Sequence, residues 1–273
     1  MANHSKYRNE ILEFLNESRH ENAITWFEGD SKYFRDNGYY SWMCNFVEGY
    51  TRVLEIGVGS GYSTMALVNS GHQVISIDEN PECLEIAYQN LKKSGINCSC
   101  IHRGNIKPMH SIHGYGIEYD KVDINYASDV ILLEGDIIAD SYLYLWLKSL
   151  PKFDAVISWL IGTHKGRSLN MICHNIDSPA AYRLTCENKT YELANEILRP
   201  CGILNIIDRT QKLDGEQEKV LYESHIAQAQ PTTLEVSRHI YQKEYETPDN
   251  GVPMGGVDKS KGLVLVSIIS VKK

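Results

Sequence analysis

The chain has 273 residues, a formal net charge of −8 at pH 7, and 42% hydrophobic against 23% charged residues, a composition typical of a globular protein with a packed core. The acidic balance disfavours nonspecific nucleic-acid binding, which needs a surplus of lysine and arginine, although a local basic patch stays open. The first 20 residues lack the apolar region of an export signal, and no apolar run is long enough to cross a bilayer. The seven scattered cysteines are typical of reduced thiols. We therefore expect a cytoplasmic protein without membrane insertion.

Residues 1–50 precede the first predicted core strand and are expected to form a helical, aromatic-rich cap. Apolar residues recur at helical spacing, which predicts an amphipathic helix near the start; they are Ile11, Leu12, Phe14 and Leu15. The aromatic side chains of this segment include Trp26, Phe27, Tyr33, Phe34, Tyr39, Tyr40, Trp42 and Phe46. One interpretation is that they only pack helices onto a sheet, because aromatic side chains bury large areas wherever they fall.

A glycine-rich turn follows the first apolar strand. Glu55 stands at the end of that strand, Gly57, Gly59 and Gly61 follow at alternate positions, and a helix is predicted from Tyr62. Glycine permits positive φ and lets the backbone approach a ligand that a Cβ would exclude. The third glycine comes one residue earlier than in the dinucleotide pattern G-x-G-x-x-G, and Glu55 would repel a phosphate but could bind an ammonium, directly or through water.

About twenty residues later, a second buried strand, 73–78, ends in an acid. Asp78 stands where a carboxylate usually binds the hydroxyls of a ribose, and Glu79 beside it is assigned to the same site. The segment 53–78 resembles the class I S-adenosylmethionine-dependent methyltransferases, with the spaced glycines as their first motif. The resemblance implies S-adenosylmethionine as cofactor and a Rossmann-like α/β fold, namely a seven-stranded, mostly parallel sheet with an antiparallel seventh strand and helices on both faces. It also implies an N-terminal cap that folds over cofactor and substrate, as the alternative to simple packing.

Two segments compete for the third strand. One ends near Asn105, and the other, residues 130–137, is the stronger buried run of Val, Ile and Leu. In the resembling family this strand commonly ends in an acid or amide that reaches the adenine amine. The favoured interpretation assigns that contact to Asp136 and Ile137 and makes about 96–128 an insertion with a hairpin or substrate-facing lobe. The alternative assigns it to Asn105 and moves the insertion downstream.

The second half of the chain supplies further landmarks of the same family. The run Phe153-Asp154-Ala155-Val156 resembles the F-D-x-V fourth strand, and Leu198-Arg199-Pro200-Cys201-Gly202 resembles the L-(K/R)-P-G-G turn before the fifth strand, with Cys201 in place of the first glycine. Antiparallel sixth and seventh strands are expected at 232–241 and 262–271. We therefore predict a methyltransferase core over residues 51–273.

The end of the fourth strand is where the family orients the acceptor. Methyl transfer is an in-line displacement in which the protein aligns the nucleophile, excludes water and, for a hydroxyl or ammonium, removes a proton. Ser158 and Trp159 are assigned to the cofactor site, although a tryptophan at a strand end is more often a core residue. His164 is the one residue near this strand end with a pKa suited to proton abstraction near neutrality, which makes it the candidate base. The alternative is a loop histidine bonded to the backbone or exposed to solvent.

Metal-dependent chemistry is not expected. Catechol-type enzymes of the family place an aspartate at the end of the fourth strand, and none stands between residues 158 and 164. Cys98, Cys100 and His102 would share one face of a strand and are zinc-type ligands. Their spacing is not specific, however, and such cysteines are commonly buried small hydrophobes.

Three functional hypotheses follow. The favoured one is a methyltransferase of a small molecule with an N or O nucleophile, in which the aromatic cap and the insertion close over the acceptor. The second is a methyltransferase of a protein or RNA, for which a basic rim would come from Lys92, Lys93, Arg103, Lys165 and Arg167. The third is a protein that binds the cofactor without transferring its methyl group. Homo-oligomerisation stays open.

Overall fold

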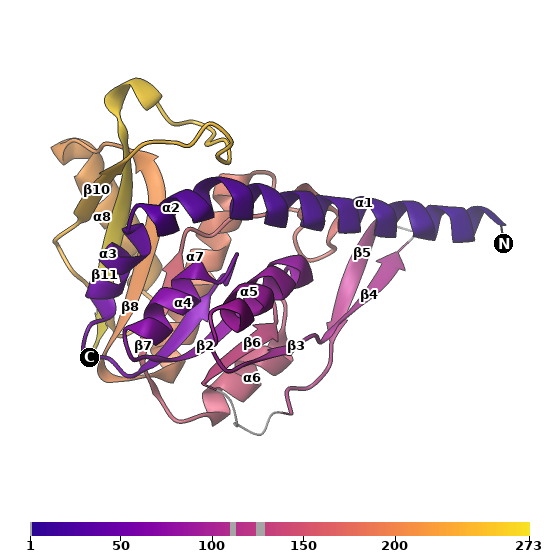
Figure 1. Ribbon diagram of the computed structural model, residues 1–273, viewed down its shortest axis with the longest axis horizontal. Coiled ribbons are helices and arrows are strands. Elements are labelled where there is room, and N and C mark those ends of the chain that lie inside the picture. Colours follow the sequence, from indigo (N-terminus) through magenta and orange to yellow (C-terminus); the bar gives the residue numbers. More distant parts are fainter. Residues whose placement is uncertain (1, 110–112, 124–128) are drawn as a thin grey trace.

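The computed structural model describes residues 2–109, 113–123 and 129–273. A nine-stranded central sheet lies between helices on its two faces (Figure 1), with the strand order β10-β11-β8-β7-β1-β2-β6-β3 and β9 paired to β11. Its strands are β1 (Arg52–Ile56), β2 (Gln73–Asp78), β3 (Cys98–Ile101), β6 (Val130–Glu134), β7 (Phe153–Trp159), β8 (Leu198–Gln211), β9 (Leu234–Val236), β10 (Tyr241–Tyr245) and β11 (Leu263–Lys272).

The sheet is buried on both faces because its central strands are nearly continuous apolar runs. Alternate residues of β1 point to opposite faces. Leu54 packs with Leu143 and Tyr191 from the helices of one face, whereas Val53 packs with Leu67 from a helix of the other. The first face carries α6 (Ser141–Ser149), α7 (Pro179–Ile197) and α8 (Gly215–Ala229); the second carries α3 (Tyr39–Cys44), α4 (Tyr62–Asn69) and α5 (Pro81–Lys93).

Of the two candidate segments for the third strand, the later one pairs with β2. Residues 130–134 form β6, which pairs in parallel with β2, and the earlier segment forms β3, an additional parallel strand outside β6. A separate hairpin follows from β4 (Gly104–Met109) and β5 (Gly114–Tyr119), as expected within the insertion; residues 110–112 and 124–128 of that insertion lie outside the described ranges. The extra strand at this edge is one reason why the sheet exceeds the seven strands expected.

The C-terminal strands confirm the antiparallel seventh strand and correct one detail. β11 runs antiparallel to β8, and β10 runs antiparallel to β11, so β10 has the same direction as the parallel strands. The expectation of two reversed strands was wrong, because the short β9 and β10 both pair with β11 and only β11 is reversed within the main strand order.

The N-terminal segment is dominated by α1 (Ala2–Trp26), a helix much longer than the pattern near the start suggested. It runs across one side of the molecule from the β4–β5 hairpin toward the glycine turn (Figure 1). Ile11 and Leu15 are buried against Tyr115 of β5, which ties the helix to the hairpin. The chain continues through η1 (Phe27–Ser31), α2 (Lys32–Asp36), α3 and η2 (Asn45–Val47). Further short helices among the described residues are η4 (Lys165–Leu169) and η5 (Lys259–Lys261).

Candidate functional site

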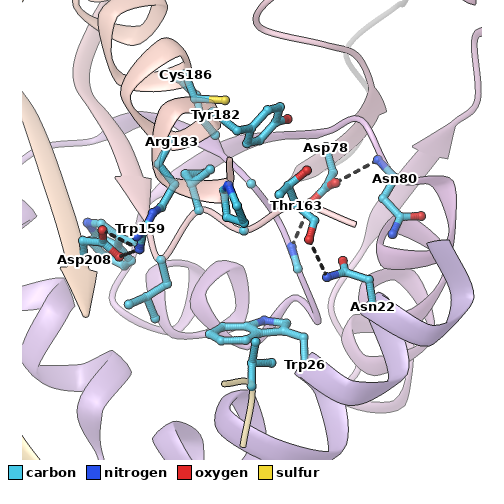
Figure 2. Close-up of a pocket in the computed structure, with 18 of the residues that line it drawn as sticks. Asn22, Trp26, Asp78, Asn80, Trp159, Thr163, Tyr182, Arg183, Cys186 and Asp208 are labelled. Atoms are coloured by element: carbon cyan, nitrogen blue, oxygen red, sulfur yellow. Dashed lines mark hydrogen bonds and ion pairs between the residues drawn. The ribbon is translucent and has the colours of Figure 1, made fainter. Parts of the chain in front are cut away.

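A cavity of about 540 Å³ opens at the carboxyl ends of the parallel strands. This edge is where ligands bind in open α/β sheets, since the loops that follow neighbouring strands diverge there. Figure 2 shows residues of its walls: Asp78 lies on one side, Asp208 on the other, and Trp26 of α1 lies below and between them in this view. The predicted site residues that line it are Gly57, Gly59, Asp78, Glu79, Asp136, Ile137 and Trp159; Glu55, Gly61, Ser158 and His164 are not among its lining residues.

The glycine turn adopts the left-handed backbone that its sequence predicts. Gly57, Gly59 and Gly61 have φ values of 84°, 51° and 78°. A Cβ on Gly59 would lie 2.7 Å from Nε1 of Trp26, and one on Gly61 would lie 2.8 Å from Cα of Ala87 in α5. The turn is therefore held tightly between α1 and α5, and its bare backbone forms part of the cavity wall.

Glu55 supports this turn from below. Its carboxylate accepts hydrogen bonds from Oγ of Ser63, from Oγ1 of Thr64 at 2.5 Å and from Oγ of Ser76 at 2.6 Å, and the residue is 1% exposed. Burial raises its pKa, and the three hydroxyl donors oppose that shift. Both oxygens are thus used to join β1, β2 and α4, which differs from the expectation that Glu55 contacts an ammonium group.

Asp78 has the placement expected of a ribose ligand. Its Oδ2 accepts the backbone N–H of Gly59 at 3.1 Å, and its Oδ1 accepts that of Asn80 at 2.9 Å. Burial raises the pKa of Asp78 to about 7, the Asn80 N–H opposes the rise, and the charge of Glu79 adds to it. The carboxylate is therefore fixed by the backbone at the cavity wall, with oxygen lone pairs still available to a ligand.

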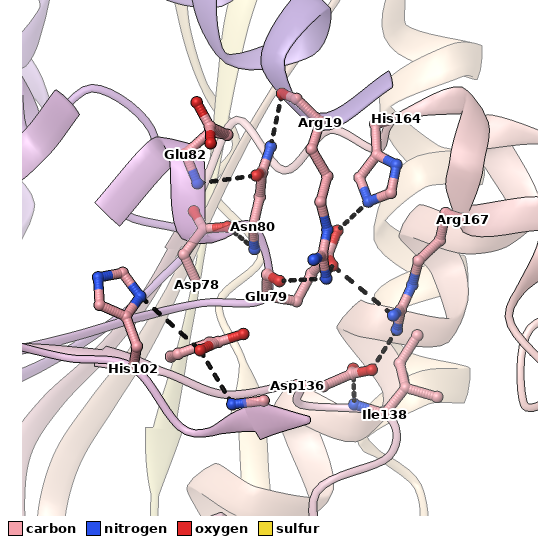
Figure 3. Close-up of polar contacts among 12 residues, drawn as sticks. Arg19, Asp78, Glu79, Asn80, Glu82, His102, Asp136, Ile138, His164 and Arg167 are labelled. Atoms are coloured by element: carbon pink, nitrogen blue, oxygen red, sulfur yellow. Dashed lines mark hydrogen bonds and ion pairs between the residues drawn. The ribbon is translucent and has the colours of Figure 1, made fainter. Parts of the chain in front are cut away.

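Glu79 belongs to a buried ion cluster that the sequence did not reveal (Figure 3). We define the ion cluster as Arg19, Glu79, Asp136, His164 and Arg167. The Glu79 carboxylate lies 3.1 Å from Nε2 of His164, 3.7 Å from Nη1 of Arg167 and 3.8 Å from Nη2 of Arg19, while Nη2 of Arg167 donates to Asp136. Burial opposes ionisation of Glu79, but His164, Arg167 and Arg19 together hold its pKa well below its usual range.

The ion cluster changes the roles expected of two residues. The His164 side chain is 1% exposed and lies against Glu79, whereas its neighbours Gly162 and Thr163 line the cavity. This geometry does not support a role for His164 as a base in contact with the acceptor. His164 is not an exposed loop residue either. Asp136 lines the cavity as expected, but its Oδ2 is engaged by Arg167 and its Oδ1 accepts the backbone N–H of Ile138 at 2.8 Å.

Trp159 is a core residue that also lines the cavity. It is 4% exposed and packs in the core, its Nε1 donates to Oδ1 of Asn205 at 2.7 Å, and it lines the cavity. Ser158 beside it is 1% exposed and points away from the lining. The end of β7 therefore supplies a rigid aromatic wall, whereas Leu160, with a φ of 61°, turns the chain along the cavity.

The side of the cavity opposite Asp78 contains charged residues that sequence reasoning missed. Asp208 in β8 accepts from Nη1 of Arg183 in α7 at 2.9 and 3.1 Å, and both residues line the cavity. Arg209 also lines it and lies 2.7 Å from the buried Asp30. A signal was present, since Ile206-Ile207-Asp208 is an apolar run that leads into an acid, the same pattern that identified Asp78.

The residues considered as zinc ligands do not form a metal site in the described part of the chain. Cys98 is buried, and Sγ of Cys100 lies 3.6 Å from Nε2 of His102. Within residues 2–109, 113–123 and 129–273, no three His, Cys, Asp or Glu side chains are grouped as metal ligands would be. In the same ranges, no helix has the length and apolar character needed to cross a membrane.

Comparisons with known proteins find similarity in the region that contains the glycine turn. A family model described as a methyltransferase domain matches residues 53–115. Protein-L-isoaspartate O-methyltransferase 1 of Syntrophobacter fumaroxidans is 41% identical over 49 residues, which cover 18% of this chain and 23% of that protein. Protein-L-isoaspartate O-methyltransferase of Methanospirillum hungatei is 48% identical over 44 residues, which cover 16% of this chain and 20% of that protein. The match thus spans less than a quarter of the length of these relatives.

Solved structures align over most of the chain at low identity. TrmN from Thermus thermophilus has a TM-score of 0.48 and 12% identity, over 86% of this chain and 48% of that chain. The N-methyltransferase NodS from Bradyrhizobium japonicum in complex with S-adenosyl-L-homocysteine has a TM-score of 0.46 and 12% identity, over 87% of each chain.

Proposed function

We propose that the chain is a class I S-adenosylmethionine-dependent methyltransferase and that it transfers a methyl group from that cofactor to a small-molecule acceptor; the methyltransferase-domain model that matches residues 53–115 supports this proposal. The observation that carries the proposal is the cavity at the strand ends, which extends from Asp78 at the end of β2 to Asp208 in β8. A cavity of about 540 Å³ lies within the range that small ligands and cofactors occupy.

The residues of the Asp78 side fit the cofactor. Asp78 would accept the ribose hydroxyls, and the bare backbone of Gly57 and Gly59 would leave room for the chain that carries the sulfonium. Ile137 would pack on the adenine ring, with Asp136 held at its edge by Arg167. When bound, the cofactor supplies an activated methyl group together with its own leaving group, so the protein's task is to orient the acceptor and exclude water.

The segments that cover the cavity support a small acceptor. Asn22 and Trp26 of α1 and Tyr40 of α3 line it from the N-terminal side, and the segment 252–257 contributes Val252, Pro253, Met254 and Val257. Nδ2 of Asn22 donates to the carbonyl of Thr163 at 3.2 Å, which fastens α1 over the end of β7. We therefore propose that residues 1–50 act as a cap that encloses the acceptor, while other aromatic residues of the segment, such as Phe34, pack in the core.

Some of the basic residues that would form a rim for a protein or RNA acceptor are buried or paired with acids in the fold. Arg103 is 4% exposed and bound to Asp140 at 2.7 Å, and Arg167 is 2% exposed within the ion cluster. Lys165 pairs with Glu21 at 3.2 Å. Two of the five basic residues considered for a rim are thus buried, which favours the small-molecule hypothesis over the macromolecular one.

Substitution of Asp78 by asparagine should weaken binding of S-adenosyl-L-homocysteine by about 1.5–3 kcal/mol, or about 10- to 150-fold, because hydrogen bonds to a charged group are lost. The carboxylate form accepts both ribose hydroxyls, and its pKa is raised to about 7. Wild-type affinity should therefore fall as the pH is lowered through about 7, and the asparagine variant should lose this dependence. Isothermal titration calorimetry measures both effects.

The exposed Asp36, whose side chain is 51% accessible, provides the matched control as Asp36→Asn. Equal affinities of wild type and Asp78→Asn would contradict the ribose assignment. Methyl transfer itself is tested with methyl-labelled S-adenosylmethionine and a panel of small amines, phenols and carboxylic acids. Label in a small acceptor supports the proposal; label found only in protein or RNA supports the second hypothesis, and cofactor binding without label in any acceptor supports the third.

A further inference from the structure

The Arg183–Asp208 pair stands apart from the nucleoside side of the cavity. Four acids line the cavity among the described residues: Asp78, Glu79, Asp136 and Asp208. The first three lie at the ends of β2 and β6, where the ribose and adenine are assigned. Asp208 lies across the cavity in β8 (Figure 2), so it is the acid that faces the space left for the acceptor.

The pair is built into two rigid elements. Asp208 belongs to β8, where its Oδ1 also accepts the backbone N–H of Arg209 at 2.7 Å. Arg183 lies in the first turns of α7. Ser178 caps the N-terminus of this helix, because its Oγ accepts the backbone N–H of Ala181 at 3.1 Å. The side chains of Arg183 and Asp208 are 33% and 29% exposed, which leaves both accessible from the cavity.

Arg209 is a second cation near this pair, but its side chain has its own carboxylate partner. The guanidinium of Arg209 is directed to Asp30, which is fully buried, and lies 5.4 Å from the ring centroid of Trp26. Burial raises the pKa of Asp208, whereas Arg183 and, more weakly, the backbone N–H and the charge of Arg209 oppose the rise. Asp208 thus has one guanidinium bonded directly to its side chain, that of Arg183, and it lines the cavity.

Both members of the pair keep hydrogen-bonding capacity for a ligand. In the described part of the chain, the hydrogen bonds of Arg183 go to Asp208 through Nη1, which leaves Nε and Nη2 as donors. A ligand that covers the pair removes water from these groups, and uncompensated desolvation of charged groups is costly. A ligand whose end next to the pair is purely apolar would leave Arg183 and Asp208 desolvated without new hydrogen bonds. A ligand with both a carboxylate and an amine would form hydrogen bonds with both side chains.

We infer that the acceptor is a small amino acid-like molecule, whose carboxylate binds Arg183 and whose ammonium binds Asp208. This inference rests on the proposed function. Asp208 accepts a proton from the ammonium: an N–H bond breaks, an O–H bond forms on Asp208, and the nitrogen lone pair is released. That lone pair forms the new N–CH3 bond while the S–CH3 bond of the bound cofactor breaks, leaving a neutral thioether, and the proton on Asp208 passes to solvent.

The apolar walls suggest a simple set of probes with a common body. Trp26, Pro253, Met254 and Val257 would surround a hydrocarbon group next to the pair. L-phenylalanine, phenethylamine and 3-phenylpropionate share an aromatic body and differ in whether they carry both charged groups, the ammonium alone or the carboxylate alone. Their binding to protein saturated with S-adenosyl-L-homocysteine, measured by calorimetry, reports on the acceptor side without any need for turnover.

We expect L-phenylalanine to bind more tightly than either single-charge probe. Asp208→Asn should weaken the two amine-bearing probes about 10-fold or more, and Arg183→Gln should do the same for the two carboxylate-bearing probes. Both variants should keep wild-type affinity for S-adenosyl-L-homocysteine, which also shows that they are folded.

Other outcomes have distinct meanings. If wild type does not bind S-adenosyl-L-homocysteine, the proposed function itself fails. If it binds but L-phenylalanine shows no preference over the single-charge probes, or no probe binds, the inference is overturned. It is also overturned if either variant loses affinity for S-adenosyl-L-homocysteine, because the pair would then hold the amino-acid end of the cofactor rather than the acceptor.

Discussion

Replacement of Gly61 by alanine should lower the free energy of unfolding by about 2–5 kcal/mol. Its φ of 78° costs a residue with a Cβ about 1–2 kcal/mol, and the new Cβ would lie 2.8 Å from both Cα and Cβ of Ala87, which adds about 1–3 kcal/mol of overpacking. The contact is with helix backbone, so no side-chain rotation relieves it. Urea unfolding followed by circular dichroism measures the change.

A variant at Gly95 separates the conformational cost of a positive φ from the cost of the steric contact with Ala87. It has a φ of 76°, and a Cβ there would meet no atom within 4 Å, so Gly95→Ala should cost only the conformational term of about 1–2 kcal/mol. The difference between the variants is the cost of pushing the glycine turn away from α5, and only Gly61→Ala should also weaken binding of S-adenosyl-L-homocysteine. An identical loss of stability in both variants would show that close packing of the turn against α5 is unimportant.

The second large effect is expected in the ion cluster. Arg167→Met should destabilise the protein by about 3–5 kcal/mol near neutral pH, because Asp136 and Glu79 would lose the guanidinium between them while they stay buried. Glu79 has a pKa held below its usual value of 4.5, so its ionisation stabilises the fold above that value, and the contribution is lost as the pH falls. The penalty of the substitution should therefore shrink below about pH 4.

Lys165 gives the control for this experiment, since it lies two residues away and pairs with Glu21 while 74% exposed. Lys165→Met should change the midpoint of urea unfolding far less than Arg167→Met, because exposed ion pairs are screened by solvent. If both variants unfold at the wild-type midpoint, the cluster contributes nothing to stability and its role in holding Asp136 and Glu79 is refuted.

The parts of the site that could be predicted lie within short stretches of sequence. The spaced glycines need a left-handed backbone, and Asp78 ends an apolar run, so both were visible without any knowledge of the tertiary structure. β6 was the stronger of two candidates for the third strand because its five residues are buried, whereas the edge strand β3 is only half covered. Asp208 also follows an apolar run, although it lies in β8 and not at the end of the fourth strand.

The remaining parts depend on segments that meet only in three dimensions. Arg19 comes from α1, Glu79 follows β2, and Arg167 belongs to η4 after β7. Their spacing in the sequence therefore does not predict that they share one buried cluster. The same contacts give His164 a surrounding that its position in the sequence does not reveal. A histidine after the fourth strand suits a base by its intrinsic pKa, but here its ring is buried against the carboxylate of Glu79 and does not line the cavity.

α1 shows how the N-terminal segment becomes part of the site. Nδ2 of Asn80 donates to the carbonyl of Arg19 at 3.0 Å, and Nη2 of Arg19 donates to the carbonyl of Glu79 at 3.3 Å, so the helix is fastened to the end of β2. Trp26 at its C-terminal end then covers the glycine turn. Long-range contacts of this kind, between residues about sixty positions apart, are set by packing and not by local pattern.

The most direct test of the account is a crystal structure of the protein with S-adenosyl-L-homocysteine. We expect the ribose hydroxyls on Asp78, the adenine beside Ile137, and the sulfur directed toward the space between Trp159 and Asp208. A ligand that lies outside the cavity, or whose ribose does not contact Asp78, would contradict the assignment of this site as the binding site of the methyl donor.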